Sequence, residues 1–228
     1  MKLISQTYFV LSLCALSLSA GAGRPMFTDD ATLTIAQTCQ IENWLVHNKT
    51  SNQITTLPAC NPTGNFEVTG GFTTTDYANV GRQDSYHLQG KALFVPLDQD
   101  HRYGVGFSAG IDRPDRNNGD NFAYIPFSIS STNQKWITDL NLGWQQNLAL
   151  ETKNTLTWGA GTTYSPNTYL SLFSEIFGNN KVKPTLHGGM SIGLIPNELQ
   201  LDLTYGHDLS IKKDGDFFTV GLNYYMPK

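Results

Sequence analysis

The sequence predicts an all-β protein, an antiparallel transmembrane β-barrel of about twelve strands. Short segments in which apolar and polar residues alternate follow one another along the chain, with turn residues between them. After the first 22 residues, no apolar run approaches the ~18 residues that a membrane helix needs. Because an open sheet would leave backbone groups unpaired in lipid, such a chain can span a membrane only as a closed barrel.

Residues 1–22 are typical of a secretory signal peptide. A basic start at Lys2 precedes an apolar stretch from about Tyr8 to Leu18 and the small residues Ala20-Gly21-Ala22. The formal net charge of the whole chain is −4, and removal of the signal peptide with Lys2 makes the mature chain slightly more acidic. A mildly acidic chain is a poor partner for nucleic acid, so we expect none.

The alternation has the period of a strand with two different faces. From Arg102 to Asp112, for example, Tyr103, Val105 and Phe107 stand on one face and glycine, serine and charged residues on the other. Segments of this kind predict strands near residues 34–46, 53–60, 64–75, 83–96, 102–112, 121–130, 135–145, 154–163, 168–177, 183–194, 199–208 and 215–226. Twelve is an even number, as a single-chain bacterial barrel requires.

The connections between these segments form two sets. Every second connection is compact and built from turn residues, as in Asn61-Pro62-Thr63 and Pro196-Asn197-Glu198. The others, such as 113–120 and 209–214, tend to be longer or more polar. This predicts short periplasmic turns at one end of the barrel and longer extracellular loops at the other.

Aromatic residues recur where an outer-membrane barrel would meet the edges of the bilayer. Trp136 and Trp144 lie on one face of one strand, roughly 26 Å apart along it. After strand tilt, that distance matches an apolar band about 25 Å tall. Tyr164, Tyr205 and Tyr224 are further membrane-interface candidates. The alternative is that these rings form the core of a soluble, secreted barrel that binds an apolar ligand.

Two cysteines remain after the signal peptide, Cys39 and Cys60. In a chain exported to an oxidising compartment we expect them to form a disulfide. A polar, turn-like stretch at 47–52 lies midway between them, so a hairpin would bring them opposite each other. Closing a loop of this size stabilises a chain by roughly 3 kcal/mol.

The polar face of the strands gives the candidate functional residues. If the apolar face contacts lipid, the residues that line the lumen are Glu42, Glu67, His87, Lys91, Arg102, Asp139, Glu175, Lys183, His187 and Asp202. They carry both signs of charge, with acids in excess. Two interpretations stay open: a channel for small solutes that weakly prefers cations, and a closed structural or surface-interaction barrel in which these charges satisfy one another.

Catalysis has little support in the sequence. The histidines are scattered, and the one cluster, His207-Asp208 with Ser210, stands at a strand end without a G-x-S-x-G context. We therefore expect no enzyme, no catalytic residues, no cofactor and no metal site, with an outer-membrane hydrolase as the less favoured alternative. The weaker metal candidates are Asp29-Asp30 and His207-Asp208.

The residues after the signal peptide carry a resemblance to a known family. Arg24-Pro25-Met26-Phe27-Thr28-Asp29-Asp30-Ala31, followed by Cys39-Gln40-Ile41-Glu42, resembles the start of a family of proteobacterial outer-membrane proteins that open with Arg-Pro-x-x-Thr-Asp-Asp-Ala. These proteins are described as transporters, some associated by name with the meta pathway of phenol degradation. The resemblance implies a barrel over 34–228 in the outer membrane, with a transport role. It also singles out 23–33 as a plug in the periplasmic mouth or a flexible leader.

The final strand resembles the signal that barrel-assembly machinery reads. Thr219, Gly221, Tyr224 and Met226 follow its spacing of a polar residue, a glycine and two hydrophobic residues. The expected partners are therefore the lipid bilayer, the barrel-assembly machinery and small-molecule solutes.

Overall fold

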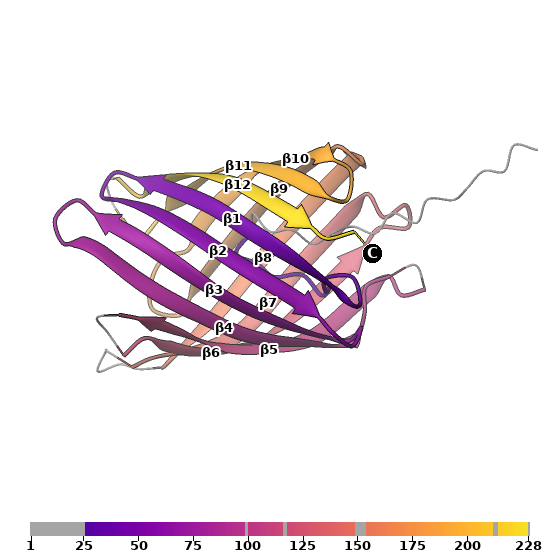
Figure 1. The fold of residues 1–228 in the computed structure, drawn as a ribbon, viewed down its shortest axis with the longest axis horizontal. Helices are drawn as coiled ribbons and strands as arrows, with labels where there is room; N and C mark the ends of the chain where they lie inside the picture. Colours follow the sequence, from indigo (N-terminus) through magenta and orange to yellow (C-terminus); the bar gives the residue numbers. More distant parts are fainter. Residues whose placement is uncertain (1–25, 99, 116–117, 149–153, 212–213, 228) are drawn as a thin grey trace, which may run out of the picture.

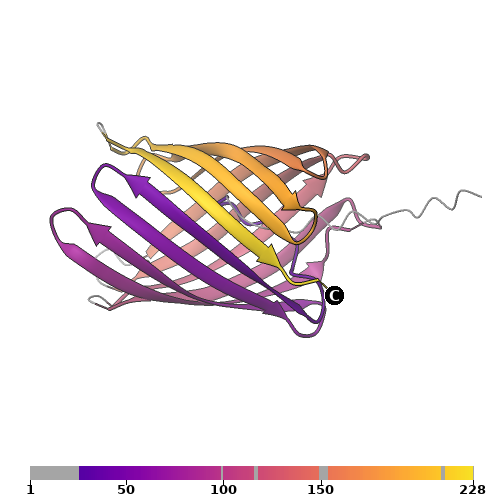
Figure 2. The same cartoon turned by 45° about the horizontal axis from the view of Figure 1, so that its top comes forward.

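The computed structural model describes residues 26–98, 100–115, 118–148, 154–211 and 214–227. Twelve antiparallel strands close into a single barrel, with strands inclined to the barrel axis (Figures 1 and 2). The expected signal peptide and the first two residues of the opening motif lie outside the described residues. Within those residues, no helix is long and apolar enough to cross a membrane.

Each strand pairs with its neighbours in sequence, and β1 pairs with β12 to close the barrel. The strands are β1 (Thr38–Asn48), β2 (Ser51–Asn61), β3 (Phe66–Tyr77), β4 (Gly81–Val95), β5 (Tyr103–Pro114), β6 (Asp120–Ser130), β7 (Trp136–Asn147), β8 (Asn154–Asn167), β9 (Leu170–Asn179), β10 (Thr185–Ile195), β11 (Leu199–Asp208) and β12 (Asp216–Tyr225). The predicted twelve-stranded barrel is confirmed.

The first strand begins later than the sequence predicts, at Thr38 rather than at residue 34. Thr34 donates its backbone N–H and its hydroxyl to the Glu67 carboxylate, at 2.7 and 2.6 Å, so it is not part of the ladder. Gln37 then turns the chain with a positive φ of 64°. Residues 34–37 therefore continue the segment that precedes the barrel.

The two ends of the barrel differ less in loop length than the sequence predicts. The longest connection at the end that carries the C-terminus, 96–102, is as long as the longest at the opposite end, 209–215. Several strands run about two residues further into the opposite end than predicted, which shortens the hairpin connections at 49–50 and 78–80. Polar residues that are typical of loops when considered by themselves are thus part of paired strands in the barrel.

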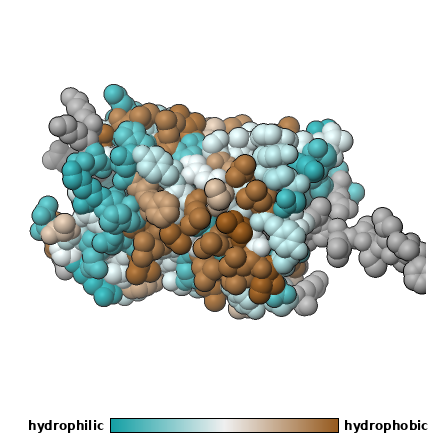
Figure 3. Space-filling model, turned by 90° about the horizontal axis from the view of Figure 1, so that it is seen from above, coloured by the Kyte–Doolittle hydropathy of each residue, from teal (hydrophilic) through white to brown (hydrophobic). Residues whose placement is uncertain are grey.

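The distribution of polarity is the reverse of that in a water-soluble protein. Among the described residues, only four hydrophobic side chains are buried, while the buried set is dominated by polar and charged residues. Leu142, for instance, is 65% exposed on the outside, whereas Asp202 is 1% exposed on the inside. On the face shown in Figure 3, apolar residues gather over the middle of the barrel and hydrophilic residues toward its ends. Such a surface requires lipid around it.

This arrangement gives a direct test of the lipid-facing surface. Leu142→Arg places a charge halfway along β7, and we expect it to lower the free energy of unfolding in lipid by about 2–4 kcal/mol. Val80→Arg, in the exposed turn between β3 and β4, is the matched control and should change it by about 0.5 kcal/mol or less. Urea unfolding of the barrel in vesicles measures both. Equal effects at the two positions would contradict a lipid-covered exterior.

The predicted disulfide is confirmed. Cys39 on β1 lies directly opposite Cys60 on β2, and their sulfur atoms are bonded. The disulfide lies at the end of the hairpin where residues 34–37 lead into β1. It therefore links β1 and β2 next to the point where the chain enters the barrel wall.

The expected interface aromatics lie on strands at both ends of the barrel. Trp136 stacks on Tyr164 with ring centroids 4.5 Å apart, near the end where β7 begins, and Tyr224 lies near the same end. Trp144 and Tyr205 lie toward the opposite end of their strands. Trp136, Trp144, Tyr205 and Tyr224 are exposed on the outer surface. Their place at the edges of a bilayer stays a prediction.

Candidate functional site

Residues 26–37, called here the N-terminal segment, run through the lumen of the barrel before β1 begins. Side chains from β2, β3, β4, β6, β7 and β9 bind this segment, largely through its backbone. The segment is not paired with a strand, so inward-facing polar side chains supply hydrogen-bond partners for its backbone.

Glu175 on β9 holds the start of the segment. Its two carboxylate oxygens accept the backbone N–H groups of Phe27 and Thr28 at 2.8 and 2.7 Å. His187 on β10 lies 2.7 Å from the same carboxylate through Nδ1 and 2.8 Å from the Thr204 hydroxyl through Nε2. Because Glu175 and His187 are both buried, this chain of hydrogen bonds fixes the orientation of the carboxylate.

Asp29 is the most heavily bound residue of the segment. Its backbone N–H and carbonyl both bind the side-chain amide of Asn141, at 2.6 and 2.7 Å. Its carboxylate accepts hydrogen bonds from the Lys91 ammonium at 2.7 Å and from the Tyr124 hydroxyl at 2.5 Å. The Lys91 and Asp29 side chains are only 3% and 1% exposed, so this is a buried ion pair.

The remainder of the segment is held in the same way. Ala31 donates its backbone N–H to the Ser128 hydroxyl at 2.7 Å, and that hydroxyl donates to Asp139 at 2.5 Å. Asn61 donates to the carbonyl of Thr34 at 2.7 Å. Glycine makes room for this close approach: a Cβ at Gly104 would lie 2.9 Å from the Cβ of Ala31.

Most of the predicted lumen residues are enclosed by the barrel. Glu42, Glu67, Lys91, Asp139, Glu175, His187 and Asp202 are buried, and His87 is partly buried and binds Asp112 at 2.7 Å. Four of them, Glu67, Lys91, Asp139 and Glu175, are brought together around the N-terminal segment. Glu67 and Lys91 come from the neighbouring strands β3 and β4. Glu42 and Asp202 lie on the other side of the lumen, on β1 and β11.

Two of the predicted lumen residues lie elsewhere. Arg102 and Lys183 are exposed and precede β5 and β10, so they stand outside the strands at opposite ends of the barrel. The Arg102 guanidinium donates to the carbonyl of Ser130 at 3.2 Å. Alternation predicts an inward side chain only for residues that are paired within the barrel wall. Arg102 and Lys183 lie outside the paired strands, so their side chains are exposed to water.

The sequence analysis missed a set of apolar side chains inside the barrel. Phe27 stacks on Phe177 with ring centroids 4.5 Å apart, and Phe217 stacks on His187 at 5.4 Å. On the facing wall, the inward residues include Trp44, Val46 and Leu57. Strict alternation would have found Phe217, because it directly precedes the outward Phe218. The sequence analysis considered only polar residues as candidates for the lumen and so left these side chains out.

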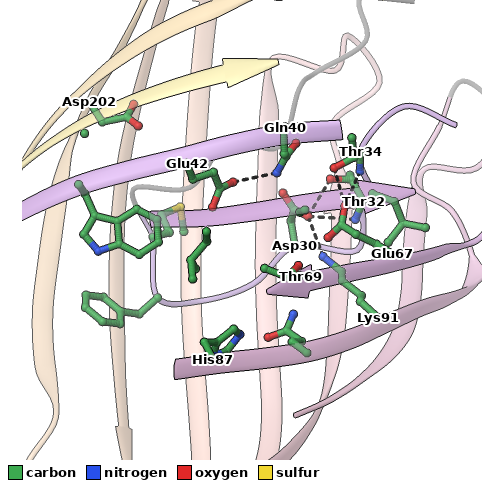
Figure 4. Close-up of a pocket in the computed structure, with 18 of the residues that line it drawn as sticks. Asp30, Thr32, Thr34, Gln40, Glu42, Glu67, Thr69, His87, Lys91 and Asp202 are labelled. Atoms are coloured by element: carbon green, nitrogen blue, oxygen red, sulfur yellow. Dashed lines mark hydrogen bonds and ion pairs between the residues drawn. The ribbon is translucent and has the colours of Figure 1, made fainter. Parts of the chain in front are cut away.

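A cavity of about 200 Å³ lies beside the N-terminal segment (Figure 4). It is bounded by the segment on one side and by β1–β4, β11 and β12 on the other. Among the described residues, the lining contains four carboxylates, from Asp30, Glu42, Glu67 and Asp202, and one ammonium, from Lys91. The described part of the lining is thus rich in carboxylates, and it is also partly apolar because Trp44, Val46 and Leu57 belong to it.

The two weaker metal candidates are engaged in other contacts. Asp29 binds Lys91 and Tyr124, and His207 binds Asp216 at 2.8 Å through Nδ1. In the part of the chain that the structure describes, no group of three or more His, Cys, Asp or Glu side chains is arranged to hold a metal ion.

Comparisons with known proteins agree with this architecture. A KdgM porin is similar in fold with a TM-score of 0.68 at 9% sequence identity, covering 82% of this chain and 99% of that one. The NanC porin gives 0.63 at 8% identity, covering 82% and 100%. The Acinetobacter baumannii outer membrane protein Omp33 gives 0.51 at 8% identity, covering 83% and 98%. At such identities the likeness shows the fold alone.

No curated protein matches the sequence. A family model does match it, over residues 10–226, which is nearly the whole chain. The chain therefore belongs to the family described as uncharacterised conserved protein UCP029691.

Proposed function

We propose that this protein is an outer-membrane channel for small solutes whose lumen is narrowed by the N-terminal segment. One observation carries the proposal: a closed barrel with an apolar exterior encloses a polar interior that still contains a cavity of about 200 Å³ beside the segment. An apolar exterior suits a bilayer, and a polar, enclosed space suits a path for solutes through it.

The structural neighbours support a channel through their shared architecture. KdgM and NanC are named as porins, and one KdgM structure is of a complex with disordered oligogalacturonate. That ligand belongs to KdgM. Among the described residues of the present chain, the cavity lining has four carboxylates and one ammonium, and we propose a weak preference for cationic or neutral solutes over anions.

A second candidate is a closed structural barrel. The observation in its favour is the number of interior side chains that bind the N-terminal segment, including Glu175, Asn141 and the Lys91–Asp29 ion pair. A barrel of twelve strands lies between small barrels filled by side chains and large porins with an aqueous channel, so conductance has to decide.

Planar bilayer recordings of the purified protein separate the two candidates. We expect discrete conductance steps in KCl and a reversal potential that favours K⁺ in a salt gradient, because carboxylates outnumber cationic groups among the lumen residues that the structure describes. Consistent silence, while a reference porin conducts in the same membranes, would reject the channel and leave the closed barrel. Retention in the outer-membrane fraction after a carbonate wash, and faster migration of the unboiled protein on a gel, test the proposed location and the folded state.

A further inference from the structure

We propose that the Glu175 carboxylate regulates the channel as a proton-sensitive clamp on the N-terminal segment. While the carboxylate is ionised it holds the start of the segment, and when acid protonates it the segment is released and the lumen widens. The inference rests on the proposed function, because it names the regulation of a channel that this segment narrows. The Glu175 clamp consists of Glu175 on β9, His187 on β10 and the backbone N–H groups of Phe27 and Thr28.

The clamp depends on the ionised form of the carboxylate. One oxygen of Glu175 accepts the Phe27 N–H at 2.8 Å and lies 2.7 Å from Nδ1 of His187, and the other accepts the Thr28 N–H at 2.7 Å. An ionised carboxylate only accepts hydrogen bonds, so it suits three donors. A protonated carboxyl carries an O–H group that faces one of these donors instead of accepting from it. Protonation therefore removes at least one of the three hydrogen bonds.

Burial makes the loss of such a hydrogen bond costly. The side chains of Glu175 and His187 are 0% and 1% exposed. A donor that loses its acceptor in such a place is a buried polar group without a partner, which is unfavourable. The Phe27 and Thr28 N–H groups can avoid this cost by moving away from the wall into the water of the lumen.

His187 positions the carboxylate in both of its own protonation states. Its Nε2 atom lies 2.8 Å from the Thr204 hydroxyl, which can donate to a neutral imidazole and accept from a protonated one. Nδ1 keeps its hydrogen in both states and continues to donate to Glu175. Acid therefore opens the clamp through the carboxylate rather than through the imidazole.

The strand on the other side of Glu175 adds no charge to the clamp. The residue opposite Glu175 on β8 is Gly161, and the residue opposite Gly161 on β7 is Asp139, two strands away. Among the described residues, Glu175 forms hydrogen bonds with the segment backbone and with His187. Other inward ionisable side chains on the surrounding elements include Asp29 and Asp30 on the segment, Lys91 on β4 and Asp202 on β11.

The Phe27 ring does not replace these hydrogen bonds. It stacks on Phe177 with ring centroids 4.5 Å apart, but Phe27 is still 59% exposed. A ring that is more than half exposed gains less from apolar burial than a ring in a core. The hydrogen bonds to Glu175 are therefore important for holding the start of the segment.

The other end of the segment stays attached to the barrel when acid releases the start. Glu67 on β3 accepts the backbone N–H and the hydroxyl of Thr34, at 2.7 and 2.6 Å (Figure 4). Protonation of Glu67 weakens this contact too, but the chain continues from Thr34 into β1 at Thr38. Acid therefore frees the start of a segment whose end remains anchored in the wall.

Hydrogen exchange of the folded barrel in detergent measures the Glu175 clamp directly. Between about pH 7.5 and about pH 4, the protection factors of the Phe27 and Thr28 amides, corrected for the intrinsic effect of pH, should fall about tenfold or more. Glu175→Gln places an amide donor where one acceptor oxygen stood, so it should show the low protection already at about pH 7.5. Glu198→Gln removes the same charge from the turn between β10 and β11 and should behave as the wild type does.

Single-channel recordings in KCl measure whether release widens the lumen. The wild-type conductance should rise about twofold or more between about pH 7.5 and about pH 4, and Glu175→Gln should conduct at the higher level at both. Neutralising lumen carboxylates alone lowers the K⁺ conductance, so a rise indicates release of the segment. Asp202→Asn removes a lumen carboxylate that binds Gln200 and Asn223, and it should keep the acid response. Faster migration of each unboiled sample at both pH values shows that the barrel is folded.

The outcomes separate this inference from the proposed function. Protection that is the same at both pH values in the wild type, or equal in Glu175→Gln and the wild type at neutral pH, would overturn the clamp, and KCl steps in that case leave the channel standing. Protection that falls without a rise in the conductance of a conducting barrel would overturn the regulation. If protection falls as expected but the barrel never conducts, the clamp on the segment stands and the channel is rejected.

Discussion

Deletion of residues 26–33 is expected to raise the single-channel conductance several-fold. This stretch crosses the lumen and is held to the opposite walls by Glu175, Asn141 and the Asp29–Lys91 ion pair. Without it, water fills the space between β6–β9 and β1–β4, and ions pass through a wider cross-section. Single-channel recordings in KCl measure the change, and the selectivity for K⁺ should also decline as the path widens.

A second variant keeps the chain length and so serves as the control for the deletion. Replacing 26–33 with glycine and serine retains a segment but removes the Asp29 carboxylate and the Phe27 ring, and it should give an intermediate conductance. Both variants must still show faster migration when unboiled. If the deletion leaves the conductance of a folded barrel unchanged, the N-terminal segment does not limit the path.

Lys91→Met is expected to lower the free energy of unfolding by about 3 kcal/mol. The substitution removes the ammonium that lies 2.7 Å from the Asp29 carboxylate, at a site where both side chains are almost fully buried. Breaking one side of a buried ion pair costs about 3–5 kcal/mol, because the other charge stays in a poorly solvated place. Urea unfolding in vesicles, followed by loss of the fast-migrating band, gives the measurement.

The paired variant and a surface ion pair complete this test. Lys91→Met combined with Asp29→Asn should recover much of the loss, since the second change removes the buried charge. Lys49→Met breaks an exposed ion pair with Asp214, 2.8 Å apart, and should cost no more than about 1 kcal/mol. A loss from Lys91→Met as small as that from Lys49→Met would show that the segment is not anchored by this pair.

The strands and their faces could be predicted because both are local properties of the sequence. In β5, Gly104, Gly106 and Ser108 are buried between outward Tyr103 and Phe107, as the alternation predicts. The pairing of Cys39 with Cys60 follows equally from a hairpin centred between them. Alternation with a period of two residues can be read within one strand, because successive side chains point to opposite faces of the sheet. It therefore shows which face contacts lipid without reference to distant residues.

The interior could not be predicted to the same depth. Alternation assigned Glu175 and Lys91 to the lumen but gave no sign that they would bind the N-terminal segment, which lies 148 residues away from Glu175 in sequence at Phe27. Alternation also assigned Arg102 and Lys183 to the lumen, although these residues precede β5 and β10 and are not part of the paired strands.

The sequence by itself therefore determined the architecture of this protein: twelve strands, a lipid-facing and an enclosed face, and a disulfide in the first hairpin. Only the tertiary structure decided what fills the enclosed space, namely a segment bound by side chains from both sides of the lumen and, beside it, a partly aromatic cavity lined in part by carboxylates. The physical reason is the sequence separation of the residues that interact. The choice between lipid and lumen is made residue by residue, whereas Asp29, Lys91, Tyr124 and Asn141 meet only after the barrel has closed around them.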